Sequence, residues 1–514
     1  VLALWALPLA FLGFFFFQPL IAIFNLVGNS LQPSGGAVVS AQFILRPLGF
    51  TLWQAFLSTL LTLLVGIPAA YIFAHYNFPG KHIFRALTAL PFILPTVVVA
   101  AAFNALVGPR GWINLLFMEV MGTSTPPLQM INSLAVIVLA HVFYNTSIII
   151  RVVGSAWSQL DSRLEQAGRA LGASPWQVLR EVTFPLLRPA IFAAALLVFL
   201  FDFTSFGVIL LLGGPQYATL EVETYIQALI MLNLPLAGVL SLVQMGCTLL
   251  LTAAYSRMTA RVNIPLAPRL QGKNSLRART KKERVMVAGV ILMLFVLLVL
   301  PLTGLALRSV TRLEAARGER GEVTSGLTLV YYQELFINRR GSIFYFPPIE
   351  AARNSLTYAA ITVGISLSLG LLAASALTRK IELNRLLDPL LMLPLGTSAV
   401  TLGLGFIVVF NRPPFDARSF PLIVPIAHSL VALPFVVRIL QPALQAIPPN
   451  LRQAAAVLGA SPWRVWWEID LPIIARAVLV SATFPFTISL GEFGATSCLA
   501  RPEYPTLPVA SYGF

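Results

Sequence analysis

Two acidic residues lie inside apolar stretches of this 514-residue chain. Asp202 belongs to the run from Leu200 to Gly207, and Glu492 belongs to the run from Ser489 to Gly494. A carboxylate is costly to place at membrane depth, so such residues are functional candidates by default. Two acids beside a central pathway would favour a cationic solute. The alternative is that they cap broken helices or pair with a neighbouring arginine.

The residues around the two acids match one another. Glu492 aligns with Ser205, which lies one helical turn after Asp202, so both carboxylates are expected on similar helix faces. The neighbouring candidates for an apolar gate, for which plain packing is the alternative, are Phe206, Gly207, Phe493 and Gly494. These residues form the predicted transport pathway.

Enzyme chemistry finds no support in the sequence. His, Ser and carboxylate residues do not cluster at catalytic spacing. The phosphate-binding pattern Gly-x-x-x-x-Gly-Lys-Ser/Thr is absent from the sequence. His141 and His428 recur as a pair without a third ligand, so we interpret them as packed, hydrogen-bonded residues rather than a metal site. We therefore expect neither catalysis nor a metal nor a bound cofactor in this chain.

Composition indicates an integral membrane protein. The chain is 57% hydrophobic and 11% charged, with a mean hydropathy of +0.82, whereas soluble proteins carry roughly 25% charged residues. A net charge of +15 would suggest nucleic acid in a soluble domain, but in a membrane protein basic residues collect in loops on one side. Cys247 and Cys498 lie in or beside apolar stretches and suit neither a disulfide framework nor a metal site.

Apolar runs of about 20 residues predict membrane-spanning helices. The eleven predicted spans are 4–27, 50–74, 85–107, 133–153, 187–212, 233–255, 285–307, 353–377, 387–410, 421–441 and 474–498. The expected fold class is therefore all-α. A twelfth span beyond Phe514 would complete two equal sets of six.

One polar segment occurs twice. Glu165 to Pro185 reads EQAGRALGASPWQVLREVTFP, and Arg452 to Pro472 reads RQAAAVLGASPWRVWWEIDLP, with 11 of 21 positions identical at an offset of 287 residues. The same offset pairs His141 with His428, and an offset of 304 pairs Gly66 with Gly370 upstream. Two halves built alike in one orientation imply a pseudo-two-fold axis along the membrane normal, with a pathway between the halves.

The distribution of Lys and Arg predicts the orientation. The loop at residues 80–85, both repeated segments and the basic stretch 257–284 fall on one side of the predicted spans, which we interpret as cytoplasmic. Arg151 and Arg438, at the cytoplasmic ends of matching spans, are expected to be snorkelling anchors. We predict a first half at 1–256, a basic linker at 257–284 and a second half at 285–514. Contact with anionic lipid is the alternative role for the linker.

Local chemistry predicts a helix–turn–helix shape for each copy of the repeated segment. Gly172 stops or bends the first helix, Ser174 caps a second with Pro175 in its first turn and Gln177 in a capping box, and Pro185 ends it. The second copy repeats this plan with Gly459, Ser461, Pro462 and Pro472, while Arg464 replaces the capping Gln.

Each short second helix is expected to offer an apolar face. The residues of these faces are Trp176, Leu179 and Val182 in the first copy, and Trp463, Trp466 and Ile469 in the second. An apolar face on a cytoplasmic helix needs lipid headgroups or a protein partner. A hairpin that binds nothing is the structural alternative, but it does not account for two exposed Trp-bearing helices on one side.

The repeated segment resembles the EAA loop of permeases from binding-protein-dependent ABC importers. The matching residues are Glu165, Ala167, Gly172 and Pro185 in one copy, and Ala454, Gly459 and Pro472 in the other. Two copies in one chain resemble the fused permeases of the ferric-iron and thiamine importers. In that family the loop forms the coupling helix that docks on the ATPase. Arg452 stands where the motif has Glu, so the second interface is expected to use other charges such as Glu468.

The resemblance implies partners and a mechanism. It implies a dimeric ATPase that holds ATP and Mg²⁺, an extracytoplasmic solute-binding protein, and a multi-pass location in the bacterial cytoplasmic membrane. No nucleic-acid partner is expected. Hydrolysis on the ATPase would drive alternating access. Residues 213–216 and 219–221 are similar to thiamine permeases, while length and layout fit ferric-iron permeases equally. The alternative class is an ion-coupled secondary transporter, which leaves the twin loops without a role.

Overall fold

The fold is helical, as the apolar runs predict. The computed structural model describes residues 2–30, 40–262, 276–277, 280–312, 326–337, 347–379, 381–410, 416, 420–499 and 503–513. Among them, extended structure is limited to two small sheets: β1 (Tyr76–Asn77) pairs in parallel with β2 (Leu276–Arg277), and β3 (Thr311–Arg312) pairs antiparallel with β4 (Gly326–Leu327).

The chain forms two compact units that cross the boundary between the sequence halves. Unit 1 contains Val1–Ser40, Glu223–Met245 and Tyr332–Phe514, and unit 2 contains Ala41–Val222 and Gly246–Tyr331. The N-terminal helices therefore pack on helices of the second half, and the helices that begin the second half pack on the first. The exchanged elements are α1 (Leu2–Leu12), η1 (Gly13–Phe17) and α2 (Gln18–Ser30), and α15 (Lys281–Leu294), η5 (Phe295–Val299) and α16 (Leu300–Ser309).

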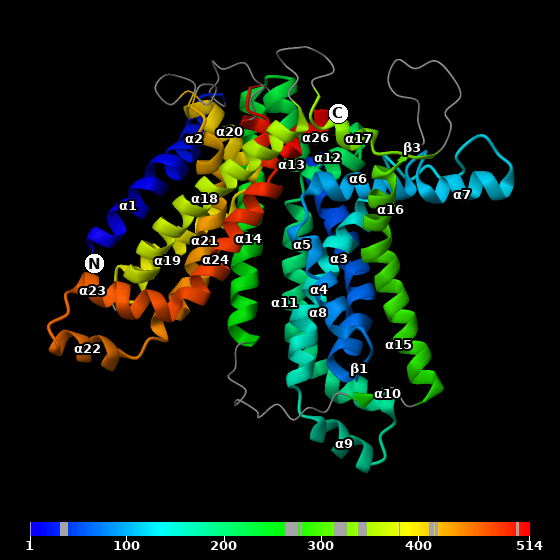
Figure 1. Ribbon diagram of the computed structural model, residues 1–514, viewed down its shortest axis with the longest axis horizontal. Helices are drawn as coiled ribbons and strands as arrows, with labels where there is room; N and C mark the ends of the chain where they lie inside the picture. The colour runs from blue at the N-terminus through cyan, green and yellow to red at the C-terminus, as the bar shows by residue number, and fades with distance from the viewer. Residues whose placement is uncertain are drawn as a thin grey trace. The chain divides into compact units, whose positions relative to one another are not determined.

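Three long helices form the centre of unit 2: α3 (Gln42–His75), α8 (Leu134–Gln159) and α11 (Phe184–Phe203). They pack against one another and run side by side in Figure 1. Gly66 allows the close approach of α3 and α8, because a Cβ at this position would lie 2.6 Å from the Cβ of Ile149. Burial of the shared aliphatic residues, such as Ile149, Val153 and Leu187, stabilises this bundle.

Unit 1 repeats this arrangement with α18 (Pro348–Leu377), α21 (Ile423–Gln445) and α24 (Leu471–Gly491). Gly370 allows the same close approach, since a Cβ there would overlap the side chain of Val436. The two glycines are the pair that the sequence repeat aligns at an offset of 304 residues.

A side-chain tie repeats in both units and extends the internal repeat beyond the polar segments. Thr51 Oγ1 accepts a hydrogen bond from the backbone N–H of Leu220 at 3.0 Å. Ser355 Oγ accepts one from the N–H of Leu507 at 2.8 Å. Each tie joins the start of a central helix to the segment that follows the fifth span of its half. The two repeats therefore agree in tertiary contacts as well as in sequence.

All eleven regions predicted to span the membrane are mainly helical, but the third, fifth, ninth and eleventh contain breaks. Ten helices are long and apolar enough to cross a bilayer, or eleven if one bent pair counts as a span. That pair is the ninth predicted region, in which Asn384–Gly396 and Ala399–Val409 meet at 97°. The third predicted region is also broken, into α4 (Lys81–Leu87), α5 (Leu90–Ile93) and α6 (Thr96–Val107). Proline explains the break between α5 and α6, because Pro95 holds extended backbone directly before α6.

The remaining elements include the span α14 and shorter helices. They are α7 (Trp112–Met121), α12 (Gly207–Leu212), η3 (Pro215–Tyr217), α13 (Leu220–Tyr225), η4 (Ile226–Ile230), α14 (Leu234–Val262), α17 (Val330–Glu334), α19 (Asn384–Met392), η6 (Leu393–Gly396), α20 (Ala399–Val409), α25 (Gly494–Leu499) and α26 (Leu507–Gly513). Of the predicted linker 257–284, residues 263–275 and 278–279 lie outside the described residues.

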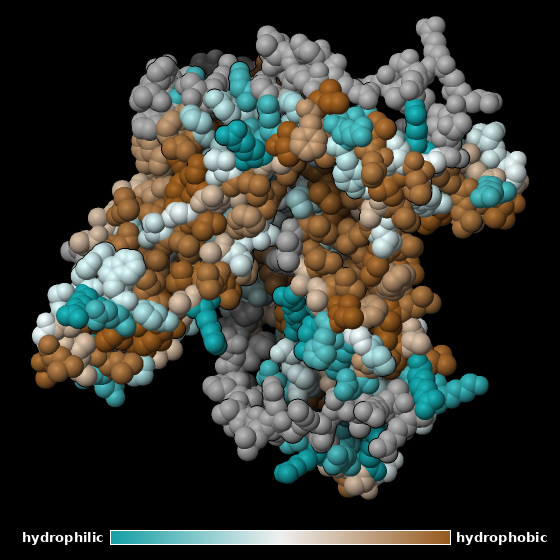
Figure 2. All heavy atoms as spheres, in the orientation of Figure 1, coloured by the Kyte–Doolittle hydropathy of each residue, from teal (hydrophilic) through white to brown (hydrophobic). Residues whose placement is uncertain are grey.

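The surface of unit 2 has the polarity expected of a membrane-embedded bundle. Hydrophobic side chains cover the sides of its helices, and hydrophilic atoms gather at the end that carries the first repeated segment (Figure 2). Together with the spans, this pattern is that of a multi-pass membrane protein.

Candidate functional site

The first repeated segment forms a short helix, a glycine turn and a second helix. α9 (Ser162–Ala170) is followed by Leu171 and then Gly172, whose φ of +88° is a left-handed conformation. The N–H of Gly172 bonds to the carbonyl of Arg169 at 3.0 Å, and the N–H of Ala173 bonds to the carbonyl of Gly168 at 3.1 Å. This pair of bonds is the Schellman motif that glycine favours at a helix end. The predicted helix stop is confirmed.

The second repeated segment has the same turn. α22 (Pro449–Val457) is followed by Leu458 and then Gly459, which has a φ of +80°. The N–H of Ala460 bonds to the carbonyl of Ala455 at 3.0 Å, and the N–H of Gly459 bonds to that of Ala456 at 3.0 Å. Both turns therefore favour glycine, which adopts this left-handed backbone without strain.

The capping chemistry agrees with the sequence in both copies. Ser174 caps α10 (Pro175–Val178) by accepting from the N–H of Gln177, whose side chain accepts from the N–H of Ser174 at 2.8 Å. In the second copy Ser461 caps α23 (Pro462–Val465) by accepting from the N–H of Arg464 at 3.3 Å. The Arg464 side chain instead donates to Glu468 Oε1 at 2.9 Å.

The prediction that Pro185 and Pro472 end the second helix is wrong. A π-helical turn, η2 (Leu179–Thr183) or η7 (Trp466–Asp470), joins each short helix to the following span. The wider turn tolerates proline, which lacks an N–H and would clash with the carbonyl of an α-helical turn. Helix therefore runs without interruption from Pro175 to Phe203 and from Pro462 to Gly491.

The apolar face of the short helices is narrower than predicted. Trp176 and Trp463 are 68% and 70% exposed. The other predicted members, Leu179, Val182, Trp466 and Ile469, are half-buried. Leu179 and Trp466 pack against the cores of their units, because the π-helical turn brings each onto the adjoining span. The exposed patch instead includes residues of the preceding helix and turn at matched positions: Leu164 and Leu171, and Leu451 and Leu458.

A polar tie holds each loop together, with different chemistry in the two copies. Thr183 Oγ1 donates to Glu165 Oε1 at 3.0 Å. At the two matching positions Arg452 Nε donates to Asp470 Oδ1 at 2.8 Å. Arg452 departs from the motif, but Asp470 in the same loop supplies its partner, so the contact between the two positions is kept. The alignment of the two copies did not reveal this compensation, although both positions change together between them.

Asp202 lies in a buried polar network of unit 2. Its Oδ1 accepts a hydrogen bond from Asn145 Nδ2 at 2.6 Å, and lies 3.6 Å from His141 Nδ1. His141 bridges two hydroxyls: Nδ1 is 3.1 Å from Ser58 Oγ, and Nε2 is 2.8 Å from Ser205 Oγ. The network therefore joins α3, α8 and the C-terminal end of α11. It lies where the helix breaks before α12.

Glu492 lies in the matching network of unit 1. It caps α25, since its Oε1 accepts from the N–H of Ala495 at 2.8 Å and its Oε2 accepts from the N–H of Thr496 at 3.0 Å. His428 Nε2 lies 3.2 Å from Glu492 Oε2 and 2.8 Å from Thr496 Oγ1, while Nδ1 lies 2.9 Å from Ser489 Oγ. The expectation that the two histidines are packed and hydrogen-bonded is confirmed.

The two networks exchange the positions of acid and hydroxyl. Asp202 aligns with Ser489, and Ser205 aligns with Glu492, so each histidine faces one acid and one hydroxyl from the broken span. The sequence comparison did not single out Ser58 or its counterpart Thr362, which donates to Ser489 Oγ at 3.3 Å. Their offset of 304 residues is the signal that could have found them.

The predicted pathway residues lie together at each break. Phe206 and Phe493 are buried, and Gly207 and Gly494 begin α12 and α25. Glu492 has the capping role that was the alternative to lining a pathway. The pathway role of these residues remains a prediction. Of the two predicted anchors, Arg151 is exposed on α8, and Arg438 pairs with Asp388 at 3.4 Å.

Comparison with known proteins agrees with these features. A family model described as "Binding-protein-dependent transport system inner membrane component" matches residues 62–307 and 366–510. The thiamine transport system permease protein ThiP of Brucella abortus (strain 2308) is 27% identical over 94% of this chain and 85% of its own length. The ThiP of Escherichia coli (strain K12) is 28% identical over 96% of this chain and 88% of its own length.

A solved structure is also similar in part. It is a bacterial ABC transporter involved in the import of the acidic polysaccharide alginate, at 17% identity and a TM-score of 0.43, covering 51% of this chain and 95% of that one. The family match covers most of this chain in two parts. The chain belongs to the binding-protein-dependent transport system inner membrane components, and is a permease of the ABC importer class.

Proposed function

We propose that this permease moves a small cationic solute of the thiamine class into the cytoplasm, driven by ATP hydrolysis on a separate, dimeric ATPase. The single observation that carries the proposal is the pair of matched loops, each with a Trp more than two-thirds exposed at its tip. An exposed Trp on a built, capped helix is the kind of residue that anchors a protein interface. We place both loops on the cytoplasmic side, where the basic segments lie.

The continuous helices supply a route from the ATPase to the interior of each unit. The docking helix α10 and the span α11 form one helical stretch from Pro175 to Phe203, which ends beside Asp202. The stretch from Pro462 to Gly491 ends beside Glu492. A displacement imposed at Trp176 or Trp463 is therefore carried to the broken segment at the far end. Such motion supports alternating access.

The substrate class rests on two supports. Relatives similar over nearly the whole chain are named as thiamine permeases, at 27% and 28% identity. Thiamine carries a positive charge, which agrees with the two intramembrane acids as pathway residues. An extracytoplasmic binding protein would deliver the solute, in accordance with the family description.

Transport by reconstituted vesicles tests the proposal. The full permease with its ATPase enclosed, and the cognate binding protein outside, should accumulate labelled thiamine only when ATP is enclosed, and an uncoupler should leave uptake unchanged. Ferric iron offered in the same way is the comparison cargo. Uptake that needs an ion gradient and ignores enclosed ATP would overturn the proposal in favour of a secondary transporter.

A further inference from the structure

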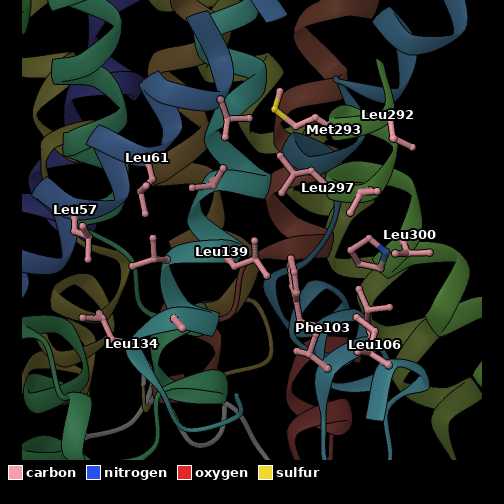
Figure 3. A pocket seen from close by; sticks show the side chains of 18 of the residues that line it. Leu57, Leu61, Phe103, Leu106, Leu134, Leu139, Leu292, Met293, Leu297 and Leu300 are labelled. Carbon is pink, nitrogen blue, oxygen red and sulfur yellow. The ribbon is translucent and has the colours of Figure 1, made fainter. Parts of the chain in front are cut away.

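A large apolar groove lies within unit 2, away from the polar networks. Its volume is about 970 Å³, and it opens between α3 and α8 on one side and α15, η5 and α16 on the other. Figure 3 shows side chains from both sides converging on it, among them Leu57, Leu61, Leu139 and Leu297. Every lining residue among those described is apolar. Water would find no polar partners in such a space.

The groove is open along its side. Leu292 and Val296 both line it, yet are 62% and 48% exposed. Both belong to the helical stretch Lys281–Ser309, which is long and apolar enough to cross a bilayer. The opening therefore faces the acyl chains of the bilayer.

One end of the groove is closed by α6 and α7. Phe103 and Leu106 of α6 and Ile113 of α7 line this end, and both helices run across the end of the unit opposite α9 (Figure 1). Trp112 anchors α7, donating from Nε1 to the carbonyl of Gly304 at 2.8 Å. Trp is typical of the membrane–water interface. This end of the groove therefore lies near headgroup level.

Two arginines lie at the same end. Arg110 is exposed, and Arg308 Nη1 donates to its carbonyl at 3.2 Å, so the two residues lie together. The exposed apolar residues of the neighbouring α7 are Leu116, Val120 and Met121. Apolar side chains beside cationic ones match a phospholipid, which has an acyl chain below an anionic phosphate.

We propose that a phospholipid of the leaflet opposite α9 and α10 binds unit 2 with an acyl chain in this groove and its phosphate near Arg110 and Arg308. An unfilled groove would leave its lining without contact atoms on one side, which forfeits dispersion energy. A flexible chain entering past Leu292 and Val296 supplies those contacts. The bound lipid thus completes the packing of α15 and η5 on the first-half helices.

Photo-crosslinking tests the acyl-chain site. The full permease is reconstituted in vesicles that contain phosphatidylglycerol with a diazirine on its acyl chain, then irradiated, and adducts are mapped by mass spectrometry. Adducts should concentrate on residues 289–300 and 57–65. Gly289→Trp fills the groove from a position with open space at its Cβ, and should lower these adducts several-fold. Gly364→Trp, which also has open space at its Cβ but lies in unit 1, should leave them unchanged.

Lipid retention tests the headgroup site. Arg110→Gln and Arg308→Gln should each lower the phospholipid that remains with the permease after detergent washing, while Arg46→Gln, an exposed arginine on α3, should not. Adducts spread evenly over exposed helix surfaces, or unchanged by Gly289→Trp, would overturn the proposal. Lipid retention that neither Arg110→Gln nor Arg308→Gln lowers would overturn it as well, because the phosphate would then not lie near these residues.

Discussion

Arg452 and Asp470 form an ion pair at 2.8 Å in the second loop, at the two positions where Glu165 and Thr183 share a hydrogen bond in the first. Both positions changed, but the tie between the first short helix and the π-helical turn remains. The tie fixes the angle between α22 and the long helix that begins with α23. We infer that the loop needs this angle, and that the identity of the tie is secondary.

Removal of one partner of the ion pair should therefore weaken the loop. Arg452→Ala should lower the free energy of unfolding by about 1 kcal/mol, since Asp470 is buried but Arg452 is partly exposed and screened. Uptake should fall with it. The double change Arg452→Glu with Asp470→Thr recreates the first loop's chemistry and should restore both, measured by thermal unfolding and vesicle uptake.

Arg438→Ala is the control for this prediction. Its pair with Asp388 is more than half exposed on the arginine side, so its loss should cost at most a few tenths of a kcal/mol. A double variant no better than Arg452→Ala alone would show that the pair does not act as a tie.

The glycine turns should be needed for coupling. Gly172→Val and Gly459→Val each force a β-branched residue into left-handed backbone, at a cost of about 1–2 kcal/mol. The turns should then change angle, so that ATP hydrolysis continues without matching uptake while membrane insertion is preserved. Gly364→Val, at an exposed helical position with open space, is the matched control. Normal uptake by a variant that carries both Gly172→Val and Gly459→Val would refute the coupling assignment.

The exposed tryptophans should matter for binding and little for folding. Trp176→Ala and Trp463→Ala should leave the thermal midpoint nearly unchanged, because both side chains are largely exposed. Loss of an anchor residue should weaken binding of the ATPase by about 2 kcal/mol or more, measured as its dissociation constant from the permease. Trp466→Ala should instead lower the thermal midpoint and change ATPase affinity little, because Trp466 packs on the core of unit 1. Equal ATPase affinity in all three variants would rule out the docking role.

Glu492 should prove to be both a cap and a pathway residue. Glu492→Gln weakens the cap of α25 and should lower the free energy of unfolding by about 1 kcal/mol. Asp202→Asn removes the other acid of the proposed pathway. Both variants should raise the thiamine concentration needed for half-maximal uptake, if the acids attract the cation. Unchanged uptake kinetics in correctly folded variants would assign the acids to structure alone.

The sequence predicted where the membrane-spanning helices lie but not which helices pack together. Hydropathy reports which residues lie at membrane depth, and all eleven regions are mainly helical. It does not report which helix packs on which, so the exchange of α1 and α15 between the two units was not foreseen. The predicted halves, 1–256 and 285–514, follow the internal repeat and the basic linker, while the compact units combine elements of both.

The local failures have a single physical source. Pro185 was expected to end a helix, because proline breaks an α-helical turn. The structure accommodates it with the π-helical turn η2, which no residue type in the sequence marks. The turn also rotates Leu179 onto the core, so the exposed face is smaller than periodicity suggested. Glycine stops and serine caps depend on local backbone chemistry alone, and these predictions were confirmed.

Crosslinking from the loop tips to the ATPase tests the central claim most directly. Leu171→Cys and Leu458→Cys each place a thiol on an exposed loop tip and keep Trp176 and Trp463 in place, and Phe192→Cys places one on the exposed side of α11 as a control. In transport-active vesicles, each tip cysteine should crosslink to an ATPase subunit, and the control should not. A transport-active complex in which neither tip reaches the ATPase would contradict the account.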